Sequence, residues 1–268
     1  MDDPDLKLLV AILLVLIVAG AGWYFRDELF PKQDEPVVTL PQEAPAPASA
    51  EDVPKHPIAP YEPPQGGPSE LVPLPPLDDS DGYFLLALLD VFGTSIEPLL
   101  MKEAIIDRFV ATVDNLPRDH VAEKIRPVGR LSDAFRADNQ GKNRPIYISA
   151  ENYQRYDHLV SRIATADIDQ LVDTYRRFYP LLQQSYQRLG YPNAYFNDRV
   201  IEVIDHLLAT PRVAEPIELV RPHVLYQFAD PDLEGLSSGQ KLLLRMGSAH
   251  ADVTKGMLRE LRTQLAKQ

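Results

Sequence analysis

Carboxylates and an imidazole gather in the stretch 194–208, which the spacing of its apolar residues predicts to be an amphipathic helix. The polar face of that helix carries Asp198, Glu202, Asp205 and His206. Such groups at i, i+4 converge on one face and could hold a divalent cation for a hydrolase or another metal-dependent enzyme. Against this, Arg199 interrupts the face, and the sequence has neither H-E-x-x-H nor a second acidic helix with Glu-x-x-His spacing. We therefore expect a solvated face, no metal and no cofactor, and keep the enzyme as the alternative.

Two short motifs near the C-terminus imitate active sites. Residues 235–239 satisfy G-x-S-x-G, the nucleophile elbow of α/β-hydrolases, but that elbow needs a buried strand where the sequence has A-D-P-D-L-E. Ser237 followed by Gln240 instead predicts a capping box that starts a helix. Residues 238–241 fit the S-x-x-K of penicillin-binding enzymes, without their S-D-N and K-T-G motifs. Both patterns are interpreted as structural, and no catalytic residue is expected here.

A bend at residues 190–193 is the third candidate. Gly190 can end one helix, Pro192 prevents its continuation, and Asn193 can cap the next. Aromatic and charged side chains beside the bend form a candidate interaction surface, made of Tyr191, Tyr195, Phe196, Asp198, Arg199 and Glu202. The alternative is that Tyr191 and Phe196 point inward and hold the corner together. The same choice between a partner groove and core packing applies to the seven tyrosines from Tyr153 to Tyr195, which alternate with arginines.

The charge distribution separates the chain into two parts. Residues 1–80 hold 4 basic and 14 acidic groups, whereas residues 81–268 hold 23 and 25. A nearly neutral domain without a basic block lacks the footprint of a nucleic-acid binder, so no nucleic-acid partner is expected. The chain has no Cys, which excludes disulfides, thiolate zinc sites, iron–sulfur clusters and thiol nucleophiles.

Residues 8–25 predict a single-pass transmembrane helix after a short tail at residues 1–7. They are eighteen residues without a charge, about 27 Å as a helix, close to the roughly 30 Å of a hydrocarbon core. The competing interpretation is a cleaved signal peptide, but the acidic start lacks the positive charge that such a leader carries. We expect an uncleaved signal-anchor that contacts the lipid bilayer. Flanking charge hardly decides the topology; the short tail, the missing thiols and the long stalk favour a domain outside the cytoplasm.

Residues 26–80 predict a disordered acidic tether. Residues 31–80 contain 14 of the 25 prolines and a net charge of −7, a composition that cannot bury enough apolar surface to offset its ordering entropy. The domain is expected to begin at Asp81 and to fold on its own over residues 81–268. It should be mostly α, with one small β-hairpin at 131–148 and Pro180 kinking or breaking the longest helix.

Three long runs between residues 115 and 247 resemble a known family. They are N-L-P-R-D-H-V-A-E-K-I-R-P from residue 115, the stretch 175–211, and V-L-Y-Q-F-A-D-P-D-L-E-G-L-S-S-G-Q-K-L-L-L-R-M-G from residue 224. They are similar to the proteobacterial family catalogued as domain of unknown function 3014. The resemblance implies a bacterial envelope protein with an N-terminal anchor, a variable stalk and a helical domain, and it carries over no functional residue.

Together these observations favour a non-enzymatic inner-membrane protein. It would present a helical binding or scaffold domain to the periplasm, with an envelope protein or glycan as its partner. The alternative is an envelope hydrolase or metal-dependent enzyme that uses the acidic helix face.

Overall fold

The structure is a computed structural model that describes residues 53–61, 73–127, 135–139, 141, 144–164, 167–223 and 225–266. The predicted anchor at 8–25, the tail before it and most of the tether lie outside these residues. Among the helices that are described, none has the length and apolar character needed to cross a bilayer.

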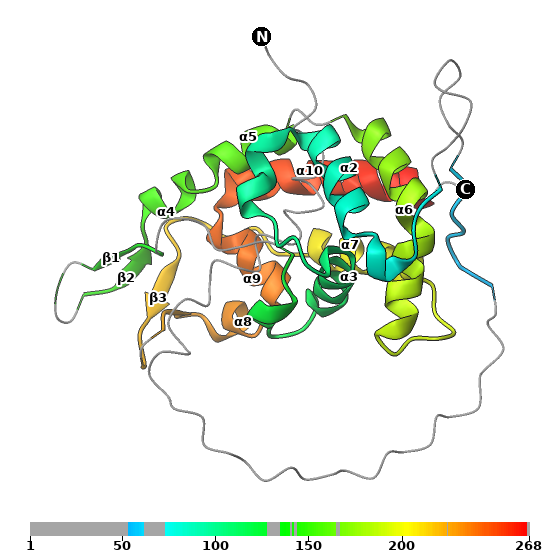
Figure 1. Cartoon of the computed structure of the whole chain (residues 1–268). Helices are drawn as coiled ribbons and strands as arrows, with labels where there is room; N and C mark the ends of the chain where they lie inside the picture. The colour runs from blue at the N-terminus through cyan, green and yellow to red at the C-terminus, as the bar shows by residue number, and fades with distance from the viewer. Residues whose placement is uncertain are drawn as a thin grey trace, which may run out of the picture.

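The described chain is mostly helical, with one small antiparallel sheet (Figure 1). Short 3-10 segments, labelled η, lie between the helices. The elements are, in order, η3 (Leu77–Asp79), α2 (Asp81–Phe92), η4 (Thr94–Leu99), α3 (Ile105–Asn115), η5 (Glu123–Ile125), β1 (Ala137–Asn139), β2 (Ile146–Ile148), α4 (Ala150–Gln154), α5 (Asp157–Ala164), α6 (Ile168–Arg188), α7 (Phe196–Leu208), β3 (Glu218–Val220), β4 (Gln227–Phe228), α8 (Pro231–Glu234), α9 (Ser238–Arg245) and α10 (Ser248–Ala266).

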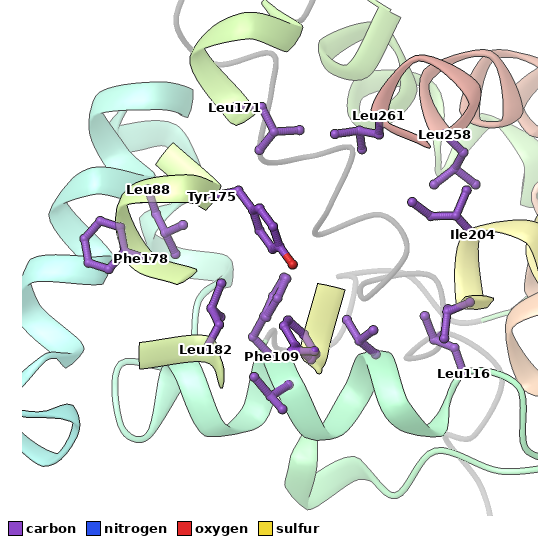
Figure 2. Packing of buried hydrophobic residues seen from close by; sticks show 14 of the residues in the cluster. Leu88, Phe109, Leu116, Leu171, Tyr175, Phe178, Leu182, Ile204, Leu258 and Leu261 are labelled. Atoms are coloured by element: carbon purple, nitrogen blue, oxygen red, sulfur yellow. The ribbon is translucent and has the colours of Figure 1, made fainter. Parts of the chain in front are cut away.

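The main core lies between α2, α3, α6, α7 and α10, which pack against one another (Figure 2). Aromatic rings connect its parts in a continuous series. Phe178 of α6 meets Phe84 of α2 edge-on at 5.0 Å, Phe84 meets Phe109 of α3 at 6.3 Å, and Phe109 meets Phe196 of α7 at 6.1 Å. Edge contacts of this kind add to the stabilisation from burial, so α7 is attached to the same core as α2.

The sheet is larger than the hairpin expected from the sequence. β1 and β2 pair as predicted, but β3 and β4, for which no strand was predicted, extend the sheet in the order β1-β2-β3-β4. The strands have only two or three residues each, too few for a period-2 pattern to show in the sequence. A second, smaller core lies under the sheet, made of Ile148, Ile217, Leu219, Phe228 and Leu244.

The predicted helix boundaries were right in part. Asp167 accepts hydrogen bonds from two N–H groups at the start of α6, and Ser237 with Gln240 forms the expected capping box of α9. Asp81, the first residue of α2, accepts from the N–H groups of Ala104 and Ile105 at the start of α3, at 2.7 and 3.0 Å.

Of the two predicted effects of Pro180 on the longest helix, a kink or a break, the break does not occur. α6 runs through Pro180 over 21 residues. Pro180 is on the exposed side of the helix, where water can hydrate the carbonyl that loses its N–H partner. Buried neighbours such as Phe178, Leu181 and Leu182 hold the helix on its other side.

Two segments of the predicted tether, residues 53–61 and 73–80, contact the helical domain. The domain therefore starts before Asp81, and the expectation of disorder over all of residues 26–80 is corrected. Leu77 is 4% exposed and lies in the main core, Ser80 is buried, and Asp78 forms an ion pair with Arg188 at 2.5 Å. The arginine lowers the pKa of Asp78 through this hydrogen bond. Residues 53–61 also contact α7, where Lys55 and His56 donate hydrogen bonds to Asp198. Composition could not reveal these contacts because they form with helices far along the chain.

At the start of α9, Gly239 approaches Leu207 and the residue after α3 more closely than a larger residue would without displacing them. The N–H groups of Ser238 and Gly239 donate to the carbonyls of Arg118 and Leu116 beyond α3. A Cβ on Gly239 would lie 2.6 Å from Leu207 Cδ2 and 3.2 Å from the Leu116 carbonyl oxygen. The Gly239→Ala variant should therefore lose about 1–3 kcal/mol of unfolding free energy.

The matched control is Gly256→Ala in α10, where an added Cβ meets nothing within 4 Å. Because alanine favours helix, this variant should gain about 0.5–1 kcal/mol. Denaturant unfolding of the full chain measures both, and equal stability of the two variants would contradict the close approach.

Candidate functional site

The predicted candidate surface lies at the corner between α6 and α7, and a side chain from α6 holds that corner in place. Gly190 has φ 117°, a left-handed conformation that suits glycine and ends α6. The N-cap of α7 is Tyr195, not Asn193, and its side chain makes no capping bond. Gln183 replaces the cap, because its Oε1 accepts from the Phe196 N–H and its Nε2 donates to the Ala194 carbonyl, both at 2.7 Å.

Two of the three corner aromatics face inward, which was the alternative interpretation. Phe196 is 0% exposed in the main core, so it cannot belong to an interaction surface. Tyr191 is half-buried, stacks on Tyr186 at 4.7 Å, and donates its hydroxyl to Asp114 Oδ2 at 3.2 Å. Burial raises the pKa of Tyr186 to about 12. Tyr195 is half-buried at the start of α7.

Core packing also explains three of the other tyrosines in the Tyr–Arg stretch. Tyr156, Tyr175 and Tyr186 are between 1% and 4% exposed. Burial raises the pKa of Tyr175 well above its ordinary value, so its hydroxyl stays protonated and can donate. The rings of these three residues are therefore unavailable to a partner.

The carboxylate of Asp114 in α3 joins α3 to α7 and to the α6–α7 corner. Its side chain is 3% exposed. Its carboxylate accepts from Arg199 Nε at 2.9 Å, Arg118 Nη2 at 2.9 Å and the Tyr191 hydroxyl, while Arg199 Nη2 donates to the Asp114 carbonyl at 2.7 Å. Burial alone would lower the pKa of Arg199, but hydrogen bonding to Glu202 and the charge of Asp114 raise it. Arg199 is thus a structural cation.

The four groups of the acidic face are directed at four different partners. Asp198 accepts from the N–H groups of Lys55 and His56, and Glu202 pairs with Arg199 at 2.9 Å. Asp205 pairs with Arg262 of α10, and His206 Nε2 lies 2.8 Å from Ser237 Oγ. No group of three such side chains that could hold a metal is found among the residues that the structure describes.

His206 behaves as a neutral hydrogen-bonding group in this arrangement. Its pKa is lowered first by burial and then by Arg199, against an opposing effect of Glu202. Ser237 Oγ already accepts from the Gln240 N–H, so its own proton is available to donate to a neutral imidazole. His206 therefore connects α7 to the cap of α9.

Sequence reasoning missed three residues that decide this region: Asp114, Gln183 and Asn197. A signal for Asp114 was present, since at 100° per residue it shares a helix face with the buried Val110. A carboxylate on an apolar face requires a partner, which marks it as a structural residue. Gln183 and Asn197 carry no comparable local signal, because Gln183 contacts Ala194 and Phe196 beyond the end of its own helix. Asn197 contacts His56 and Leu265, which are far from it in the sequence.

A comparison with family models matches residues 105–262 to the model described as a protein of unknown function, DUF3014. The chain belongs to this family. The matched residues run from the start of α3 into α10 and so include Asp114 and Arg199. Neither the curated proteins nor the solved structures contain a match to the chain.

Removing the charge of Asp114 should destabilise the domain more than any surface pair does. In Asp114→Asn the guanidinium of Arg199, whose side chain is 18% exposed, loses its buried counter-charge and keeps only the exposed Glu202. Breaking a buried pair on one side costs about 3–5 kcal/mol. We expect the free energy of unfolding to fall by that amount in denaturant titrations of the full chain.

Asp205→Asn is the matched control, because it removes a carboxylate from an exposed pair on α7 and should cost at most about 1 kcal/mol. Adding Arg199→Met to Asp114→Asn removes the stranded charge and should recover part of the loss. Equal effects of Asp114→Asn and Asp205→Asn would show that the buried pair is not what holds the corner.

Proposed function

We propose that this protein is a single-pass bacterial inner-membrane protein that presents its helical domain to the periplasm as a non-enzymatic binding or scaffold domain. Its partner would be an envelope protein or a glycan. The eighteen uncharged residues at 8–25 and the acidic, proline-rich stretch after them support an anchor joined to a spacer.

The observation that carries the proposal is the divergence of the acidic face. A catalytic or metal site needs groups that converge on one point. Here Glu202, Asp205 and His206 contact Arg199, Arg262 and Ser237 respectively, and each contact joins parts of the domain or fixes α7 itself. These side chains stabilise the packing of α7, which favours a binding module over the metal-dependent alternative.

Metal analysis of the purified full chain, with and without chelator, tests the non-enzymatic part. We expect the metal content of the Glu202→Ala variant to equal that of the unmodified chain, because Glu202 is held by Arg199 rather than by a cation. Glu260→Ala, which removes an exposed carboxylate from α10, is the control. One cation per chain that is lost in Glu202→Ala and kept in Glu260→Ala would establish the metalloenzyme instead.

Reporter fusions at Gln268 test the location. Alkaline phosphatase, which folds only outside the cytoplasm, should be active, whereas a reporter that works only in the cytoplasm should be silent. Deleting residues 8–25 from the phosphatase fusion should abolish its activity, because the chain then lacks its export signal and anchor. Activity of the cytoplasmic reporter alone in the intact chain would overturn the assignment.

A further inference from the structure

The first turn of α7 holds a segment that is remote from it in the sequence. Asp198 Oδ2 accepts from the Lys55 N–H at 3.0 Å, and Oδ1 accepts from the His56 N–H at 2.7 Å. Both oxygens of one carboxylate are thus used by consecutive backbone amides. Figure 1 shows the segment, in blue, running along the side of the molecule near α6 and the C-terminal end.

Asn197 completes the contact and is itself held in place by the domain. Its Nδ2 donates to the His56 carbonyl at 2.8 Å and to the Leu265 carbonyl of α10 at 3.2 Å. Its Oδ1 accepts from the Tyr175 hydroxyl of α6 at 3.3 Å, and the residue is 0% exposed. Because two of these partners belong to the domain, the amide that meets His56 is oriented in advance.

Residues 53–58 alternate in exposure along the segment. Val53, Lys55 and Pro57 are exposed, whereas Pro54, His56 and Ile58 are half-buried, and Ile58 packs against the main core. Backbone hydrogen bonds with every second side chain facing the receptor are how domains bind extended peptides. Residues 53–58 therefore contact the domain in the way that an extended peptide ligand contacts its receptor.

We propose that Asn197 and Asp198 form a peptide-binding site for a proline-flanked segment, that residues 53–61 are its intramolecular ligand, and that this ligand docks and releases. The occupant is the chain's own segment because only residues 62–72 separate it from Pro73. Such a short connection gives an effective concentration in the millimolar range, which a second copy in solution does not reach.

Docking sets the length of free chain between residue 52 and the domain. Val53 precedes Pro73 by twenty residues, so release lengthens the connection by up to roughly 60 Å at about 3.1 Å per residue. Residue 52 and everything before it are then held farther from the domain. This inference goes beyond the proposed function, since it requires neither a membrane anchor nor an external partner.

Thiol reactivity at Ile58 tests the proposal, and the absence of Cys from the chain makes the signal specific. In the full-length Ile58→Cys chain, the half-buried side chain should react slowly with a maleimide. Adding Asp198→Ala, or adding His56→Pro, which removes the N–H donor on the ligand side, should each raise the rate about tenfold or more. Asp205→Ala, on the same helix but paired with Arg262, should leave the rate within about twofold.

A second measurement needs no substitution in the segment. Trypsin should cut the Lys55–His56 bond about tenfold faster in Asp198→Ala than in Asp205→Ala, because Asp198 holds the N–H of that bond and the N–H of Lys55 before it. Equal rates in all variants, in both measurements, would show that the segment is not bound through Asp198. Protection that falls on dilution would show that a second copy supplies the segment, which overturns the intramolecular assignment.

Discussion

The buried carboxylate of Asp114 imposes the strongest constraint on this structure. An ionised group with a 3% exposed side chain costs several kcal/mol unless charges and donors surround it. Arg199, Arg118 and the Tyr191 hydroxyl meet that requirement from α7, from the end of α3 and from the α6–α7 corner. One charge on α3 therefore determines how α7 is rotated and where the corner lies.

Once Arg199 is committed to Asp114, the remaining polar groups of α7 have little freedom. Glu202 pairs with Arg199, and Asp205 pairs with Arg262 of α10. His206 forms a hydrogen bond with Ser237, the N-cap of α9. Asp198, half-buried in the first turn of α7, is instead directed at the backbone of Lys55 and His56. The face that resembles a metal site in the sequence is thus used for contacts within α7, with α10, with the cap of α9 and with residues 55 and 56.

The region before α2 contacts the rest of the domain in two places. Leu77 enters the main core, and the stretch around His56 lies on α7. Composition predicted disorder for both because proline and acidic residues dominate the region. The prediction failed locally: a few residues that hydrogen-bond to a preformed surface need no core of their own.

Much of the helical organisation was determined by the sequence alone. The apolar period of α7, the caps of α6 and α9 and the helix stop at Gly190 follow from interactions within a few residues, which a local pattern records. The candidate site and the sheet were decided by the tertiary structure. Gln183 replacing a cap, Asp114 binding Arg199, β3 pairing with β2 and Asp198 holding residues 55 and 56 all join residues that are more than ten positions apart in the chain. Such partners are chosen by burial and by the need to satisfy buried polar groups, conditions that arise only when the helices pack.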